Sequence, residues 1–343
     1  MLAIADLRVE YPTENGTVRA VRGVDLQVKE GEILGLVGES GCGKSATLLA
    51  TMRLVPFPGK ITSGQIILDG QNILELDEGE VRKVRGKTVS MILQDPMSAL
   101  NPAHKIGTQI KEALSVHGLW NRTEDGQRQL VKLLERVGIP SPETVLELYP
   151  HQLSGGMQQR VMIAIALACR PKLILADEPT TALDVTIQAQ ILDLLANINK
   201  DNGTAIILVT HNLAVASQFC HRIAVMYAGQ IIEEGPTDEV LSNPLHPYTQ
   251  GLLNCLPRFQ RRERLTSIPG QVPDLTGSIP GCAFYPRCSR RARTCRLKNQ
   301  RLMSVDGRRK VRCERWRINE VFEERVLEEE LDMVVDHDRY QDQ

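Results

Sequence analysis

Eight consecutive residues near the start of the chain have the types and spacing needed to hold phosphate groups. The stretch from Gly38 to Ser45 fits the pattern G-x-x-x-x-G-K-[ST], in which glycine lets the backbone curl closely around an anion. Lys44 is expected to reach the β- and γ-phosphates of a nucleoside triphosphate, and the Ser45 hydroxyl to bind Mg²⁺. The residues expected to contact the nucleotide are Gly38, Ser40, Gly41, Cys42, Gly43, Lys44, Ser45 and Ala46.

The alternative interpretation of this stretch is a glycine-rich turn without a ligand. A short apolar run at 32–37 leads straight into it, and a helix-forming run opens at Ala46. A phosphate loop requires a strand before it and a helix after it, because the helix start adds partial positive charge. The flanking sequence therefore favours nucleotide binding.

Two adjacent carboxylates, Asp177 and Glu178, end another apolar run much later in the chain. Parallel sheets bind ligands at the carboxyl ends of their strands, and neighbouring strand residues point in different directions. We therefore expect Asp177 to hold Mg²⁺ and Glu178 to act as the general base toward the attacking water. Gln94 and His211 also stand at strand ends, so we expect Gln94 to contact the metal or the water and His211 to assist catalysis. The alternatives are a solvated acidic strand end and a structural histidine.

A second anion-binding surface is indicated by a serine and two glycines. Ser154 is a suitable N-cap, and Gly155 and Gly156 open a helical run that stops near Arg170. The exposed N–H groups of this helix start could bind a phosphate. Taken alone, however, these residues fit an ordinary capped helix better.

Short apolar runs that alternate with helical patterns must position all of these groups. We expect strands at 2–9, 24–28, 32–37, 88–93, 172–176, 205–209 and 223–227, and a helix at 185–199. This alternation predicts an α/β fold with a parallel sheet covered on both faces. A mostly helical stretch, about 95–170, is predicted to be inserted into the sheet domain.

The chain changes character after about residue 236, where prolines gather and apolar periodicity fades. We expect a loop-rich extension over 236–318 whose apolar core is too small to hold it together alone. Residues 258–317 contain 17 Lys and Arg against four acids, whereas 319–343 contain ten acids against two arginines. The last segment is interpreted as an acidic tail.

The composition is ordinary for a soluble globular protein. Of its 343 residues 42% are apolar and 24% charged, and the net charge of -1 gives no overall preference for nucleic acid or membrane. No apolar run approaches the roughly 18–20 residues that span a bilayer, and the start of the chain lacks the features of a secretion signal. We expect a protein that stays in the cytoplasm and reaches a membrane only through a partner.

The run from Leu153 to Gln158 resembles the signature sequence of the ATP-binding cassette (ABC) ATPases. The resemblance includes the phosphate loop, the acidic strand end, a D-loop from Thr181 to Asp184 and His211 as the switch histidine. It covers about residues 1–235. It implies a P-loop NTPase fold with a RecA-like core and an antiparallel β subdomain.

The family resemblance also implies a pairing of two cassettes, which close head to tail around two ATP molecules. The phosphate loop of one then faces the signature of the other. Ser154, Gly155 and Gly156 are thus expected to contact the partner's nucleotide, with Asp184 also at the nucleotide site. The resemblance further implies that Tyr11 stacks on adenine.

Three further segments, 94–102, 149–152 and 246–250, resemble the ATP-binding subunits of dipeptide and oligopeptide importers. This similarity runs to about residue 317. It implies an ATP-hydrolysing subunit at the cytoplasmic face of the membrane, two membrane permease subunits, an extracytoplasmic peptide-binding protein and a second, non-identical ATPase. The Gln94 loop and the helical insertion are expected to touch the permeases.

Two alternative functions remain open at this point. One is an importer for nickel or another small solute, and the other is a soluble ABC ATPase that acts on nucleic acid. Soluble relatives usually contain two cassettes or a long coiled-coil insertion, and this chain has one compact cassette. We therefore expect no nucleic-acid partner.

Four of the eight cysteines form the spacing C-x5-C-x6-C-x17-C in the basic extension: Cys282, Cys288, Cys295 and Cys313. Disulfides are disfavoured in a reducing cytoplasm, so a [4Fe-4S] cluster, zinc and unligated thiols are the candidates. Structural zinc sites usually contain a closer pair of cysteines. The importer resemblance implies a [4Fe-4S] cluster, since some relatives with this pattern bind one. The arginines expected to offset its charge are Arg287, Arg290, Arg291, Arg293 and Arg312.

Overall fold

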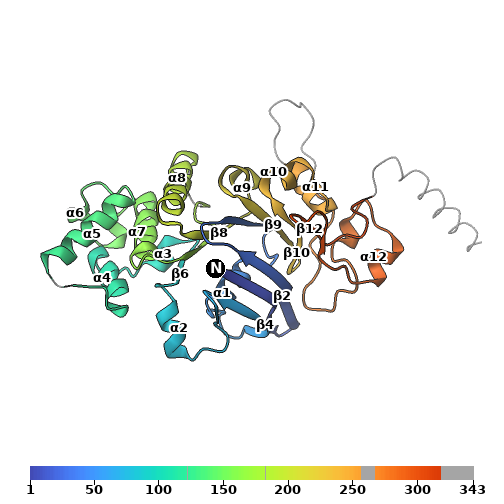
Figure 1. Ribbon diagram of the computed structural model, residues 1–343, viewed down its shortest axis with the longest axis horizontal. Coiled ribbons are helices and arrows are strands. Elements are labelled where there is room, and N and C mark those ends of the chain that lie inside the picture. Colours follow the sequence, from blue (N-terminus) through green and yellow to red (C-terminus); the bar gives the residue numbers. More distant parts are fainter. Residues whose placement is uncertain (122, 182, 256–266, 318–343) are drawn as a thin grey trace, which may run out of the picture.

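Two β-sheets form the centre of the protein in the computed structural model, which describes residues 1–121, 123–181, 183–255 and 267–317 (Figure 1). The smaller sheet is antiparallel. Its strands, in spatial order, are β2 (Gly16–Val28), β1 (Leu2–Thr13), β4 (Lys60–Leu68) and β5 (Gln71–Asn72). Those of the larger sheet, in spatial order, are β11 (Met303–Ser304), β12 (Lys310–Val311), β10 (Gln230–Pro236), β9 (Arg222–Tyr227), β3 (Ile33–Val37), β8 (Ala205–Thr210), β7 (Leu173–Asp177) and β6 (Val89–Ile92).

Five neighbouring strands of the larger sheet, from β9 to β6, run parallel, which confirms the predicted parallel sheet. Every residue of β3 is buried, because successive side chains enter different cores. Ile33 and Val37 belong to the core shared with the helices, whereas Leu34 and Leu36 belong to the core under the smaller sheet. A strand covered on both faces must be apolar throughout, which explains its continuous apolar run.

Helices fill the connections and both faces of the larger sheet. Between β6 and β7 the chain forms α3 (Pro96–Ala99), α4 (Ile106–Val116), α5 (Glu124–Arg136), α6 (Pro142–Leu146), the 3₁₀ turn η1 (Pro150–Gln152) and α7 (Gly155–Leu167). Figure 1 shows α4 to α7 gathered at one end of the molecule. The other helices are α1 (Lys44–Thr51), α2 (Glu78–Val84), α8 (Val185–Asn202), α9 (Leu213–Phe219), α10 (Thr237–Ser242), α11 (Pro247–Asn254), η2 (Tyr285–Arg287) and α12 (Arg293–Leu297).

The extension is joined to the sheet domain by aromatic packing and by strand pairing. The rings of Tyr227 on β9, Tyr248 on α11 and Phe284 meet with centroids 4.6, 5.3 and 5.5 Å apart. β12 pairs with β10 and so continues the larger sheet. The fully buried Glu233 accepts backbone N–H bonds from Leu245 and His246. It also forms a buried ion pair with Arg309, at 3.0 Å. Docking onto the sheet domain thus supplies the stabilisation that the extension lacks on its own.

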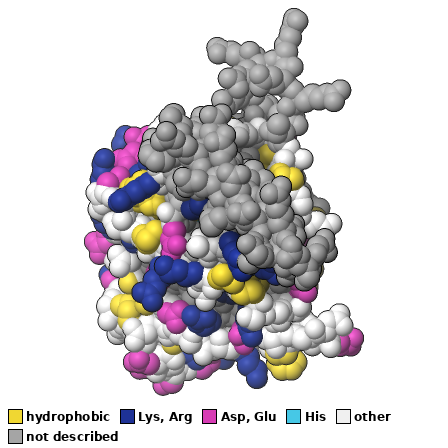
Figure 2. Space-filling model, turned by 90° about the vertical axis from the view of Figure 1, so that its right-hand side faces the viewer, with side chains coloured by type: hydrophobic (Ala, Val, Ile, Leu, Met, Phe, Trp, Pro, Cys, Tyr) yellow, Lys and Arg dark blue, Asp and Glu magenta, His cyan; other side chains and the backbone are white. Residues whose placement is uncertain are grey.

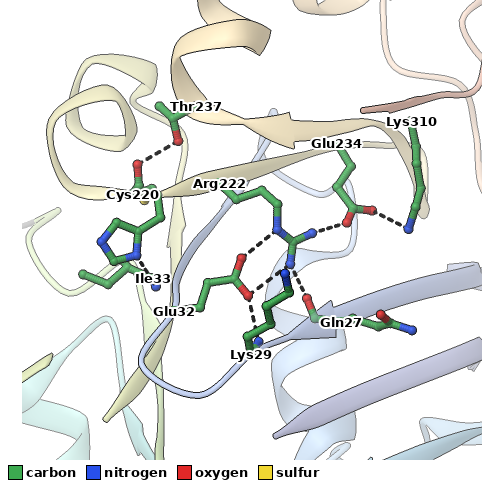
Figure 3. Close-up of polar contacts among 10 residues, drawn as sticks. Gln27, Lys29, Glu32, Ile33, Cys220, Arg222, Glu234, Thr237 and Lys310 are labelled. Atoms are coloured by element: carbon green, nitrogen blue, oxygen red, sulfur yellow. Dashed lines mark hydrogen bonds and ion pairs between the residues drawn. The ribbon is translucent and has the colours of Figure 1, made fainter. Parts of the chain in front are cut away.

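Arg222 at the start of β9 connects segments from distant parts of the sequence (Figure 3). Its guanidinium donates to Glu32 at 2.7 Å, to Glu234 on β10 and to the Gln27 carbonyl. Glu32 in turn accepts the Lys29 N–H at 2.7 Å. These contacts fix the turn between β2 and β3, and therefore the position from which β3 leads to the phosphate loop.

Within the described ranges, no helix combines the length and the apolar character needed to cross a membrane.

Candidate active site

Three parallel strands end side by side at one edge of the larger sheet. In the pairing register, Val37 of β3 lies opposite Thr210 of β8, and Val209 lies opposite Asp177 of β7. The residues that follow these strands therefore emerge next to one another. This register brings together the loop at 38–45, the Asp177–Glu178 pair and His211, although more than 130 residues separate the first two in sequence.

The loop at 38–45 curls around its own lysine. Lys44 is 5% exposed, and its ammonium donates to the carbonyls of Gly38 at 2.8 Å and Glu39 at 2.9 Å. Gly43 has φ 106°, and a Cβ there would stand 2.3 Å from the Ala20 carbonyl oxygen, so only glycine fits. Directly after it, α1 begins, with its first N–H groups at the loop. This is the strand–loop–helix geometry of a phosphate site.

A cavity of about 600 Å³ opens over this loop. It is lined by Ala20, Glu39, Ser40, Gly41, Gly43, Lys44, Ser45, Ala46, Gln94, Glu178 and His211. Its volume lies in the range of small-molecule sites. Most of the residues predicted to contact the nucleotide or to catalyse thus border one space. Cys42 instead points into the core, where it is 1% exposed.

The predicted metal ligands Ser45 and Asp177 contact each other directly. The Ser45 hydroxyl donates to the Asp177 carboxylate at 3.0 Å, and Asp177 is 8% exposed. Burial raises the pKa of Asp177, and the neighbouring Glu178 adds to this effect. A cation would favour the charged carboxylate, so the hydroxyl, the carboxylate and the nearby Gln94 amide form a suitable oxygen set for Mg²⁺.

Glu178 stands at the turn after β7 and faces the cavity. Its carboxylate accepts a hydrogen bond from the Thr181 hydroxyl at 2.8 Å and lies 3.1 Å from Nδ1 of His211. The backbone φ of 45° is uncommon for a residue with a side chain. Two partners and the turn therefore fix the direction of the carboxylate, as a base that must face a water molecule requires.

Ser154, Gly155 and Gly156, the second predicted anion surface, lie at the start of α7, and Asp184 lies at the start of α8. None of the four lines this cavity. Ser154 caps α7 and its hydroxyl accepts the Met157 N–H at 3.3 Å. Asp184 caps α8 and accepts two backbone N–H bonds at 3.0 Å. A Cβ on Gly156 would stand 3.3 Å from Ile187 of α8, so the two helix starts are adjacent. Gly155 has open space at its Cβ position. Ala182, within the predicted D-loop, lies outside the described residues.

Tyr11, the predicted adenine contact, is also outside the cavity lining. It lies on β1 opposite Val18 of β2, near the hairpin turn, and its ring packs on Gly59. Partial burial raises its pKa.

Sequence reasoning missed a direct contact between the extension and the phosphate loop. The Tyr248 hydroxyl accepts the Glu39 backbone N–H at 3.0 Å. Arg287 forms a two-pronged ion pair with the Glu39 carboxylate, at 2.8 and 3.0 Å, and its side chain is 4% exposed. Tyr248 belongs to the importer-like segment at 246–250, but that segment gives no sign of its target.

The direct charge partner of Arg287 is therefore Glu39, and its predicted role in offsetting charge at the cysteines stays a prediction. Its remaining bonds go to Tyr227 and to the carbonyls of Ile268 and Pro269. Arg312 also donates to backbone carbonyls, those of Ile231 and Gln300.

One small cavity in the extension is lined by the four cysteines of the predicted cluster: Cys282, Cys288, Cys295 and Cys313. Burial raises the pKa of Cys288 to about 11 and that of Cys313 to about 12. Within the described part of the chain, no three or more His, Cys, Asp or Glu side chains lie close enough to hold a single metal ion.

Two family models match the chain. Residues 21–181 match the ABC transporter family, and residues 232–295 match the C-terminal region of oligopeptide/dipeptide transporters.

Curated relatives are similar over most of their length. The dipeptide transport ATP-binding protein DppD of Escherichia coli (strain K12) is 48% identical over 310 residues, which cover 90% of this chain and 94% of that protein. The oligopeptide transport ATP-binding protein OppD of Bacillus subtilis (strain 168) is 50% identical over 292 residues, covering 84% and 81%. The probable peptide ABC transporter ATP-binding protein y4tR of Sinorhizobium fredii is 47% identical over 324 residues, covering 94% and 96%.

Among solved structures, the dimeric ATP-binding cassette MJ0796 bound to ADP and Pi in a post-hydrolysis state is similar. The TM-score is 0.63 at 30% sequence identity, and the match covers 69% of this chain and 99% of that one.

The Glu39–Arg287 ion pair predicts how substitutions at these two residues change the affinity for ATP. In Arg287→Ala, an uncompensated carboxylate faces the triphosphate, so ATP affinity measured by equilibrium titration should fall about tenfold. Glu39→Gln in the Arg287→Ala background removes that charge and should restore most of the affinity. The exposed neighbour Arg291, changed to Ala, is the control and should have no effect. Unaltered affinity in Arg287→Ala, or no rescue by Glu39→Gln, would show that the pair does not act on the nucleotide.

Proposed function

The chain belongs to the ABC transporter ATP-binding proteins with an oligopeptide/dipeptide-type C-terminal region, and from that premise we propose that it powers the import of di- and oligopeptides. The relatives named for dipeptide and oligopeptide transport support this substrate class. The observation that carries the catalytic part is the convergence of Ser45, Asp177, Glu178 and His211 beside the phosphate loop.

In the proposed reaction, the loop N–H groups and Lys44 hold the phosphates of ATP. Ser45, Asp177 and Gln94 hold Mg²⁺, which when bound neutralises charge on the phosphates. Glu178 accepts a proton from the attacking water, and His211, 3.1 Å away, fixes the orientation of that carboxylate. Tyr11 stacks on the adenine at the edge of the smaller sheet.

The proposed catalytic unit contains two cassettes. Ser154, Gly155 and Gly156 lie at the start of α7 and do not line this chain's own phosphate cavity, which suits contact with a nucleotide on another cassette. Asp184 lies next to them at the start of α8. The dimeric form of the similar cassette with ADP and Pi supports this arrangement.

We propose that the second cassette is a non-identical ATPase. The complete assembly then adds two membrane permeases and an extracytoplasmic peptide-binding protein, with this chain peripheral at the cytoplasmic face. Met97, which is 71% exposed and lies three positions after Gln94, is an apolar contact available to a permease. The proposed division of the chain is an ATPase domain at 1–235, with its helical part at about 95–170, and an extension at 236–318. The acidic tail at 319–343 lies outside the described residues.

The four cysteines suit a [4Fe-4S] cluster better than a single zinc ion. A tetrahedral zinc site draws its sulfurs to about 2.3 Å from one point, whereas a cluster spreads its ligands over four irons. The shared cavity brings the four cysteines together, and the resemblance to importer subunits with this cysteine spacing favours the cluster. Anaerobically purified protein should contain about four irons and four sulfides per chain. Cys313→Ser should lose them and Cys255→Ser should retain them. Stoichiometric zinc without iron would contradict the cluster.

Glu178→Gln tests the proposed reaction in the assembled transporter. The amide cannot accept the proton of the attacking water, so ATP hydrolysis and ATP-driven uptake of a labelled dipeptide should both fall by about 100-fold or more. ATP should remain bound, because the phosphate contacts are intact. The exposed Glu30, changed to Gln, is the matched control. Undiminished hydrolysis in the Glu178→Gln complex would exclude Glu178 as the base.

A further inference from the structure

A second cavity, of about 390 Å³, lies between the smaller sheet and the extension, apart from the phosphate cavity. One wall is formed by β1 and β2, and the opposite wall by the segments at 278–284 and 299–301. Tyr227, Gln230 and Ile232 contribute from β9 and β10. The two cavities have no lining residue in common.

Five arginines border this space, which we call the arginine cavity: Arg8, Arg19, Arg22, Arg301 and Arg312. Among the described residues that line it, Glu10 is the one acidic side chain, and it lies 3.6 Å from Arg19. Arg8 pairs with Asp6, on an exposed part of the sheet. Figure 2, which views the side of the molecule with the extension, shows Lys and Arg side chains interspersed with acidic ones.

Arg22 and Arg312 differ in their partners from three other buried or partly buried arginines of the fold. Arg222, Arg287 and Arg309 each form an ion pair with a carboxylate. The hydrogen bonds of Arg22 and Arg312 go instead to backbone carbonyls, those of Ala228, Ile231 and Gln300. A carbonyl satisfies an N–H group but leaves the guanidinium charge uncompensated.

The positive charges in the cavity also act on one another. The pKa of Arg22 is lowered first by burial and then by Arg312, Arg19 and Arg8. Gathering like charges in a partly buried space costs free energy, and a bound anion would recover it.

We propose that the arginine cavity is a binding site for a small metabolite that bears two or more phosphate charges. Planar guanidinium groups match phosphate oxygens in pairs, and several arginines together require a ligand with more than one charge. The cavity volume suits a small metabolite rather than a single inorganic ion. This site is additional to the ATP site and does not depend on hydrolysis.

The test is a calorimetric titration of pyrophosphate into the full chain kept saturated with Mg²⁺ and ADP, so that the phosphate loop is blocked. One equivalent should bind. Arg22→Gln and Arg312→Gln should each weaken binding about tenfold, since each removes charged hydrogen bonds to the ligand. Arg128→Gln is the control, because Arg128 lies on α5 and pairs only with exposed acids of its own helix.

Arg22 and Arg312 also bind backbone carbonyls, so their variants could lose stability for another reason. The exposed Arg301, changed to Gln, avoids this difficulty and should also weaken pyrophosphate binding at unchanged thermal stability. No binding by the native chain, or equal affinity in all the cavity variants and in Arg128→Gln, would overturn the proposal.

A phosphate-bearing ligand could come from solution or from a lipid headgroup. Phosphatidylglycerol vesicles added to the pyrophosphate titration separate the two sources. Free-metabolite binding predicts that the vesicles do not compete. Competition that Arg301→Gln abolishes would retain the phosphate chemistry but overturn the metabolite as its source.

Discussion

The register of three parallel strands is the constraint on which the active site depends. β3, β8 and β7 end in line, so the residues after Val37, Asp177 and Thr210 meet at one edge of the sheet. A shift of one residue in any strand would turn its buried side chains to the opposite core. The two separate cores on the faces of the sheet therefore protect the catalytic geometry.

The extension is an integral part of the phosphate site. Through Arg287 and Tyr248 it binds both the carboxylate and the backbone of Glu39, which lines the phosphate cavity. Tyr227 lies against both residues and also borders the arginine cavity. A ligand in the arginine cavity that touches Tyr227 would therefore be linked to Glu39 of the phosphate loop through Tyr227 and either Arg287 or Tyr248.

The sequence was a good guide wherever function depends on local pattern. The apolar runs before Gly38 and Glu178 correctly predicted the strands β3 and β7, and the glycine spacing correctly predicted the loop that curls around Lys44. It failed for contacts that only tertiary packing creates. Nothing near Arg287 in the sequence indicates Glu39, which lies 248 positions earlier, so this ion pair could not be predicted. The arginine cavity was equally hidden, because its walls come from β1, β2 and the far end of the chain.

The central claim is that this chain holds ATP with its own phosphate loop and completes a second cassette's site with the start of α7. Ser154→Arg tests it most directly, with Ser154→Ala as a control that also loses the helix cap but adds no bulk. The account predicts unchanged ATP affinity in the isolated Ser154→Arg chain and a loss of about 100-fold in hydrolysis by the assembled transporter, while Ser154→Ala retains far more activity. Undiminished hydrolysis in the Ser154→Arg complex, or a comparable loss of ATP binding by the isolated chain, would contradict it.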